Sequence, residues 1–194
     1  HGESIAVSGV CTGTPADQDP CAVWVQSSGR KPESWFVTSN ASSTARSEYL
    51  KLADVRAGER AAGLTEARDD LTTCSAVEAP GLDAPGWRTC GFEMVAFSPD
   101  GRHLLAKPDG DGLGPTGLAV YDADKGEQLL ALTVADQGYV RQMVWEGNSH
   151  VLATVYQKGQ WAIVRIGLDG SREYAVPPVA ATDDVTPPFL LPSS

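Results

Sequence analysis

The chain has 194 residues, which is enough for one well-packed domain or a compact array of repeats. Its formal net charge is −10 and no more than two Lys or Arg residues are adjacent, which argues against nucleic-acid binding and against docking on anionic lipid. The 42% hydrophobic content excludes general disorder. The 20 Gly and 13 Pro, with no long amphipathic helical stretch, predict an all-β protein.

No apolar run approaches the roughly 18 residues that span a bilayer, so direct membrane insertion is not expected. The sequence shows no signal peptide, and it starts at His1 rather than at Met. We therefore expect a processed product or a fragment of a longer protein.

The apolar runs fall into four groups, each expected to form an antiparallel sheet. The first group lacks an inner strand and has strands at 3–10, 21–26 and 33–38. The second has strands near 47–53, 59–65, 73–79 and 87–90. The third has strands at 94–97, 103–106, 117–122 and 127–134. The fourth has strands at 139–145, 150–156, 161–167 and 171–176.

The clearest turn lies in residues 92–107, FEMVAFSPDGRHLLAK. Pro99 presets φ for a turn and Gly101 supplies a positive φ, so Ser-Pro-Asp-Gly between two apolar runs predicts a hairpin. A second hairpin is expected around Asp124, between two further apolar runs.

Several segments repeat at a nearly constant spacing. Residues 58–63 resemble 101–106, and Val77 matches Val120 at the same offset of 43 residues. Residues 150–153 match 103–106. Four strands per repeat of this length predict an array of β-propeller blades. The blades are 1–45 (partial), 46–91, 92–138 and 139–176, followed by a Pro-rich tail at 177–194.

The segment AFSPDGRHLLA, followed by LAVYDADKGEQ, resembles the WD40-like, TolB-type propeller repeat, in which an F-S-P-D-G turn joins the two inner strands. The G-H and W-D dipeptides of true WD40 repeats are missing, so their hydrogen-bond network is not implied. The run CSAV…WRTCGF…FSPDG…DGLGP also looks like secreted or membrane-anchored propeller proteins of high-GC Gram-positive bacteria. This resemblance implies an extracytoplasmic location.

Soluble propellers commonly have more than four blades, and an open array exposes apolar walls at both ends. Two alternatives follow. The favoured one is a fragment of a larger propeller, whose exposed blade edges could support an oligomer. The other is a ring of four blades in which residues 189–191 supply the missing inner strand of the first blade.

The four cysteines are expected to form two structural disulfides, Cys11–Cys21 and Cys74–Cys90. In the blade arrangement, the first pair closes a long loop and the second joins adjacent ends of two antiparallel strands. No C-x₂-C pair or nearby His supports zinc binding. Two disulfides imply an oxidising compartment.

In a propeller, the loops between the second and third strands of each blade share one face, and here those loops are acidic. The candidate binding face comprises Asp17, Asp19, Glu66, Asp69, Asp70, Asp109 and Asp111. This face could bind a basic partner or a cation. Alternatively, the acidic residues are there only because Asp is common in solvent-exposed loops. Asp109 and Asp111 match the start of a calcium loop but lack its later ligands, so no metal and no cofactor are expected.

Catalytic residues are not apparent. His103 and His150 occupy equivalent repeat positions, which indicates a structural role, and no G-x-S-x-G elbow exists. The five Trp residues fall on predicted strands and are expected to pack the blades. The sequence therefore predicts a non-catalytic extracytoplasmic propeller module that binds a protein or ligand on its acidic face. The alternatives are an accessory propeller of a larger hydrolase or peptidase and a structural scaffold at the cell surface.

Overall fold

The computed structural model describes residues 4–8, 22–28, 34–38, 44–47, 49–56, 60–78, 86–110 and 114–192. For the first four ranges it describes the backbone alone. The described residues form strands and connections without a helix, as the all-β prediction requires. None of them builds a helix that could cross a membrane. The chain divides into two compact units, His1–Met94 and Val95–Ser194.

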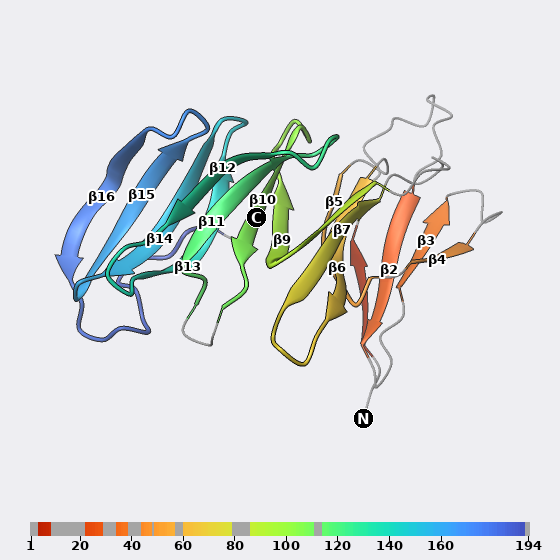
Figure 1. The fold of residues 1–194 in the computed structure, drawn as a ribbon, viewed down its shortest axis with the longest axis horizontal. Helices are drawn as coiled ribbons and strands as arrows, with labels where there is room; N and C mark the ends of the chain where they lie inside the picture. Colours follow the sequence, from red (N-terminus) through yellow and green to blue (C-terminus); the bar gives the residue numbers. More distant parts are fainter. Residues whose placement is uncertain are drawn as a thin grey trace. The chain divides into compact units, whose positions relative to one another are not determined.

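Every sheet consists of four consecutive strands in chain order, and Figure 1 shows each as a simple meander. The first sheet contains β1 (Ser4–Ser8), β2 (Ala22–Ser28), β3 (Ser34–Thr38) and β4 (Thr44–Ser47). The second contains β5 (Lys51–Arg56), β6 (Arg60–Ala67), β7 (Thr73–Glu78) and β8 (Trp87–Cys90). The third contains β9 (Phe92–Phe97), β10 (His103–Pro108), β11 (Gly117–Asp122) and β12 (Gln128–Thr133). The fourth contains β13 (Tyr139–Glu146), β14 (His150–Gln157), β15 (Gln160–Gly167) and β16 (Arg172–Ala180).

The prediction that the first sheet lacks an inner strand is wrong, because the three predicted strands are β1, β2 and β3 and a fourth strand, β4, follows them. β4 pairs with β3 in antiparallel register, with Trp35 opposite Arg46 and Phe36 opposite Ala45. Its sequence, TARS, has almost no apolar content. A strand of this kind is held by backbone hydrogen bonds and leaves no hydrophobic periodicity to detect.

A buried tyrosine holds the second sheet together. Tyr49 is 1% exposed, its hydroxyl donates to the carbonyl of Ala61 at 2.7 Å, and it accepts the backbone N–H of Glu78 at 3.1 Å. A Cβ on Gly63 would lie 2.8 Å from the Tyr49 ring, so the glycine makes room for it. Burial raises the pKa of Tyr49 well above its ordinary value, and the phenol is therefore neutral.

The third and fourth sheets share one apolar core within the second unit. Buried residues of β10, β11, β13, β14 and β15 meet there: Leu105, Leu118, Val120, Val140, Val151, Ala153 and Ile166. Along β14 the side chains that face the third sheet alternate with those on the opposite face, as a strand requires. Packing against the third sheet therefore uses only one face of the fourth sheet.

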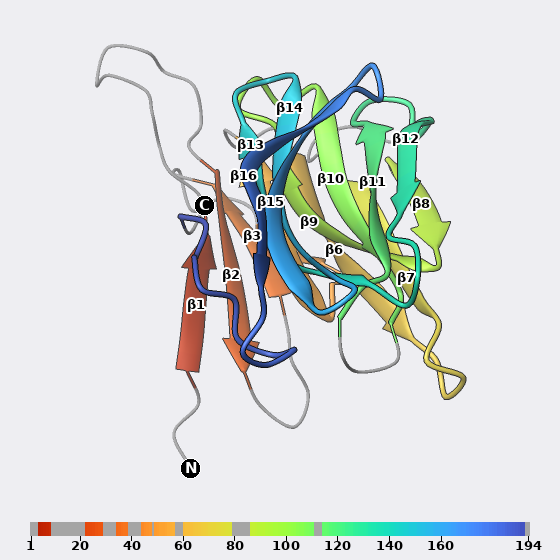
Figure 2. The same cartoon turned by 90° about the vertical axis from the view of Figure 1, so that its left-hand side faces the viewer.

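The opposite face of the fourth sheet is covered in part by the chain that follows β16. The Trp161 indole is fully buried and donates to the carbonyl of Asp183 at 3.1 Å, and the N–H of Leu191 donates to Oε1 of Gln142. The chain turns back after β16, as the dark blue trace in Figure 2 shows, and its contacts with Trp161 on β15 and Gln142 on β13 place it across the sheet. Residues 189–191 form no strand, in contrast to the ring alternative, and the backbone N–H of Leu191 donates instead to the Gln142 side chain on β13.

The Ser-Pro-Asp-Gly turn between β9 and β10 is organised by two side chains. The Ser98 hydroxyl is buried, donates to Oδ1 of Asp100 at 2.6 Å and accepts the N–H of His103 at 3.0 Å. Asp100 also accepts the N–H of Arg102, and Gly101 has a φ of 73°. These contacts explain why this residue order closes the hairpin.

Replacement of Ser98 by Ala should destabilise the protein by about 1–3 kcal/mol, because it removes a buried hydroxyl and leaves the partly buried N–H of His103 without its acceptor. The hydrogen bond from Ser98 is also the main reason why the pKa of Asp100 is lowered. Because the pKa of Asp100 is lower in the folded than in the unfolded chain, where it is near 4, its ionised carboxylate stabilises the fold at neutral pH. This stabilisation decreases as the pH falls below the unfolded-state pKa, and it is lost once the pH passes the folded-state pKa. Urea unfolding at pH 7 and pH 3 should show a stability gap between wild type and Asp100→Asn that shrinks at pH 3. A gap that is equal at both pH values would contradict this assignment.

Candidate functional site

The structure describes four of the seven predicted acidic residues. Glu66, Asp69 and Asp70 lie together at the connection between β6 and β7, in the first unit. Asp109 follows β10 in the second unit. Asp17, Asp19 and Asp111 lie outside the described residues, so only Asp109 of the calcium candidate pair is described. Among the described residues, no group of three or more His, Cys, Asp or Glu side chains could hold a metal ion.

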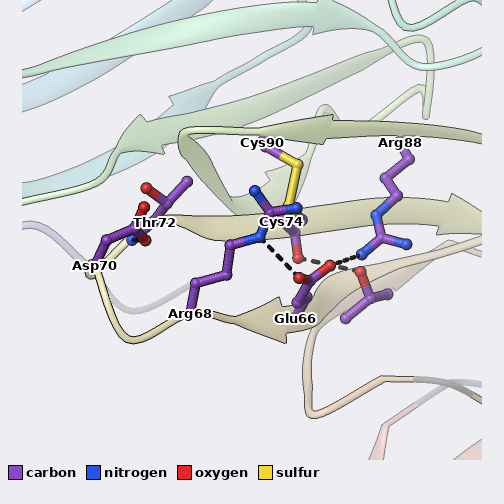
Figure 3. Close-up of polar contacts among 8 residues, drawn as sticks. Glu66, Arg68, Asp70, Thr72, Cys74, Arg88 and Cys90 are labelled. Carbon is purple, nitrogen blue, oxygen red and sulfur yellow. Dashed lines mark hydrogen bonds and ion pairs between the residues drawn. A yellow bond between two sulfur atoms is a disulfide. The ribbon is translucent and has the colours of Figure 1, made fainter.

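Glu66 belongs to the end of β6, and two arginines pair with it. Its Oε1 lies 2.7 Å from Nε of Arg68 and its Oε2 lies 2.5 Å from Nη2 of Arg88 on β8. Figure 3 shows the carboxylate between the two guanidinium groups. The hydrogen bond from Arg68, with the charge of Arg88, lowers the pKa of Glu66. The negative charge of Glu66 is therefore balanced by two arginines. The unbalanced negative charge at the β6–β7 connection comes from Asp69 and Asp70.

The β6–β7 loop, residues 68–72, has a defined backbone. The N–H of Arg68 bonds to the carbonyl of Thr72 at 3.0 Å, and the N–H of Leu71 bonds to the carbonyl of Arg68 at 3.0 Å. Oδ1 of Asp70 accepts the N–H of Thr72, an Asx turn, and this contact lowers the pKa of Asp70. The loop is therefore a closed turn in which the N–H groups of Arg68, Leu71 and Thr72 are paired.

Leu71 stands at the tip of this loop in an unusual state. Its side chain is 71% exposed and its φ is 67°. A left-handed conformation costs about 1–2 kcal/mol in a residue with a Cβ, and a bulky side chain there is an outlier. Sequence reasoning missed this residue, because the chain offers no Gly or Asn at the position that would signal a positive φ.

A disulfide fixes the base of the loop. Cys74 at the start of β7 is bonded to Cys90 at the end of β8, as the sequence predicts, and the two residues are direct cross-strand partners. Cys74 is fully buried, and the bridge lies next to the Glu66 cluster in Figure 3. The other predicted pair, Cys11–Cys21, lies outside the described residues. The strand that follows the loop, β7, is thus covalently joined to its neighbour β8.

The two histidines of the strands lie at equivalent places, at the first residues of β10 and β14. The His103 ring lies 6.2 Å from that of Trp145, and its Nδ1 is buried without a partner among the described residues. His150 contacts the Ser149 hydroxyl at 3.0 Å. The nearby Asp169 carboxylate is engaged by the Ser171 hydroxyl and N–H. These contacts do not form the hydrogen-bonded series of nucleophile, histidine and carboxylate that a catalytic triad has.

The described tryptophans of the second unit pack as predicted. Trp145 donates its indole N–H to the carbonyl of Ala96 at 3.0 Å, which ties β13 to β9. The Trp161 ring packs edge to face against Tyr139 and at a tilt against Tyr156, with ring centroids 5.9 and 5.0 Å away. Neither ring forms an open platform for a sugar, since Trp161 is fully buried and the Trp145 N–H is used within the protein.

Comparison with known proteins identifies the fold. No protein-family model and no curated protein matches this sequence. Among solved structures, the chain is similar to the β-propeller domain of the Trilobed protease from Pyrococcus furiosus, which has an open velcro topology. The TM-score is 0.54 at 16% sequence identity, and the match covers 84% of this chain and 57% of that one. The chain thus has a β-propeller fold and spans just over half the length of the similar structure.

Proposed function

We propose that this chain is a non-catalytic propeller module that binds a protein partner through the β6–β7 loop, with Leu71, Asp69 and Asp70 as the contact residues. The observation that carries the proposal is the state of Leu71, which is both strained and exposed. Strained residues persist where surrounding structure holds them, and they cluster at sites of recognition. An exposed leucine beside two carboxylates fits a partner with a small apolar pocket bordered by Lys or Arg.

Electrostatics support the same partner chemistry. The chain carries a net charge of −10, and Asp69 makes no polar contact with any described residue. Asp70 is exposed and accepts hydrogen bonds from Thr72 within the loop, so its carboxylate is held in place at the surface. A basic partner would be steered toward this surface at low ionic strength.

The setting of the module is part of the proposal. The Cys74–Cys90 bridge supports an extracytoplasmic location, because such bridges persist in oxidising compartments. The Ser98 and Asp100 contacts in the F-S-P-D-G turn support assignment to the TolB-type, WD40-like repeats. His150 contacts Ser149, whereas the hydrogen bonds of the Asp169 carboxylate come from Ser171, and this division supports a non-catalytic role.

A second candidate is an accessory propeller of a larger peptidase. The observation that favours it is the similar structure, which is the propeller domain of a protease. In that case the β6–β7 loop would contact the catalytic domain or its substrate. Sequencing the gene around this segment separates the two candidates, since a peptidase domain in the same chain would favour the second.

The test uses Leu71→Gly, which removes the apolar contact and suits a positive φ. Its free energy of unfolding should stay within about 1 kcal/mol of wild type, because relief of strain offsets the added freedom of the unfolded chain. Immobilised wild type should retain a protein from the envelope of the producing cells, and Leu71→Gly and Asp69→Asn should lose it. Leu129→Ala is the matched control, because Leu129 is a 43% exposed leucine on β12. Equal retention by wild type and Leu71→Gly would refute the proposal.

A further inference from the structure

A cavity of about 380 Å³ lies within the second unit, between the third and fourth sheets. Its inner wall is built from buried apolar residues, including Leu118, Val140, Ala153 and Ile166. Val155 and Val164 extend this wall toward the outside. The cavity is therefore a continuation of the shared core that side chains do not fill.

Small residues explain why the space stays open. Gly117, Ala135 and Ala153 line it, and none has a side chain larger than a methyl group. Gly117 cannot be larger, since a Cβ there would lie 1.9 Å from the carbonyl oxygen of Leu132. Blades of a propeller are arranged radially, so two neighbouring sheets separate toward their outer strands, β12 and β16. Space between those strands remains unless large side chains occupy it.

The outer edge of the cavity carries a free positive charge. Arg172, Glu173 and Tyr174 on β16 line it, and the Glu173 carboxylate pairs with Arg165 at 2.9 Å. Side chains alternate along a strand, so the Glu173–Arg165 pair lies on the opposite face from Arg172. Arg172 itself makes no ion pair with any described residue. The cavity thus has an apolar interior and a guanidinium group at its mouth.

We propose that this cavity binds a small amphiphile with a single unbranched hydrocarbon chain and a carboxylate, its chain between the sheets and its carboxylate at Arg172. A volume of 380 Å³ equals about a dozen water molecules at ~30 Å³ each, so a ligand of roughly twelve non-hydrogen atoms fits. Cavities of this size and lining are typical of small-molecule sites. Arg binds carboxylates through two parallel hydrogen bonds, which fixes the head group. The site is independent of the β6–β7 loop.

The test is calorimetric titration with decanoate, with decanol as the neutral comparison ligand. Decanoate should bind wild type with a Kd at or below about 1 mM, the range expected for a ligand of this size. Decanol should bind about tenfold more weakly, because it lacks the charge-assisted hydrogen bonds to Arg172. Arg172→Gln should weaken decanoate by a similar factor and abolish the preference for decanoate over decanol. Arg102→Gln is the matched control, since Arg102 is exposed, lies outside the cavity and has a side chain without a described ion pair.

A variant that fills the cavity provides the second arm. Val155→Phe should weaken both ligands at least tenfold, and its near-UV circular dichroism shows whether it is folded. The proposal is overturned if decanoate does not bind in the millimolar range, or if a folded Val155→Phe binds it as wild type does. Equal binding of decanoate and decanol by wild type would also overturn it. If Val155→Phe does not fold, the Arg172→Gln comparison decides alone, because Arg172 is exposed and its replacement leaves the core intact.

Discussion

Replacement of Trp161 by Ala should lower the free energy of unfolding by about 3–5 kcal/mol, the range for loss of a fully buried tryptophan. The indole is enclosed by Tyr139 and Tyr156 on one side and by the tail on the other, where it donates to the carbonyl of Asp183. Its loss leaves a cavity and removes a contact that holds the tail on the fourth sheet. Urea unfolding followed by far-UV circular dichroism measures the change.

Trp161→Phe is the control for this prediction. It keeps an aromatic ring beside Tyr156 and removes only the N–H and part of the volume, so it should cost clearly less than Trp161→Ala. Deletion of residues 182–194 should reproduce part of the Ala effect, since it uncovers the same indole. A loss below about 1 kcal/mol for Trp161→Ala would show that the tail does not cover this face.

Removal of the Cys74–Cys90 bridge should cost about 3 kcal/mol, the expected entropy effect for a closed loop of 16 residues. The double variant Cys74→Ala, Cys90→Ala tests this, and thermal unfolding with and without reductant measures it. Wild type should lose stability in reductant and converge on the double variant.

The control is thermal unfolding of the double variant with and without reductant. Any effect of reductant on its stability must come from the other two cysteines, Cys11 and Cys21. Equal stability of wild type with and without reductant, together with free thiols in the native protein, would contradict the bridge. Because the bridge anchors β7, the strand that follows the β6–β7 loop, its loss should also weaken partner binding.

Local signals in the sequence predict much of this fold. The turn at Ser98–Asp100 and the disulfide Cys74–Cys90 depend on residues close in the chain, so residue type and spacing suffice to predict them. The alternation and spacing of apolar runs indicate four groups of strands, and the structure has four four-stranded sheets. The polar strand β4 is missed, because its pairing uses backbone groups that every sequence has.

The candidate site is less accessible to sequence reasoning. The acids Glu66, Asp69 and Asp70 look alike in the sequence, yet only Glu66 pairs with arginines. One of them, Arg68, is close in the chain, but Arg88 lies 22 residues further along. The ion pair between Glu66 and Arg88 depends on the strand register, which places β8 beside β7 and near β6. The strain at Leu71 follows from the path of the loop and not from the type of residue. Such features arise from the folded geometry alone.

Photo-crosslinking from position 71 tests the central claim, that the β6–β7 loop is a protein-binding site. A photoreactive leucine analogue replaces Leu71, and the protein is irradiated with envelope proteins of the producing cells. We predict one dominant crosslinked partner, suppressed by excess unlabelled wild type but not by excess Leu71→Gly. The claim is contradicted if no partner is crosslinked, or if the same analogue at position 129 yields the same partner.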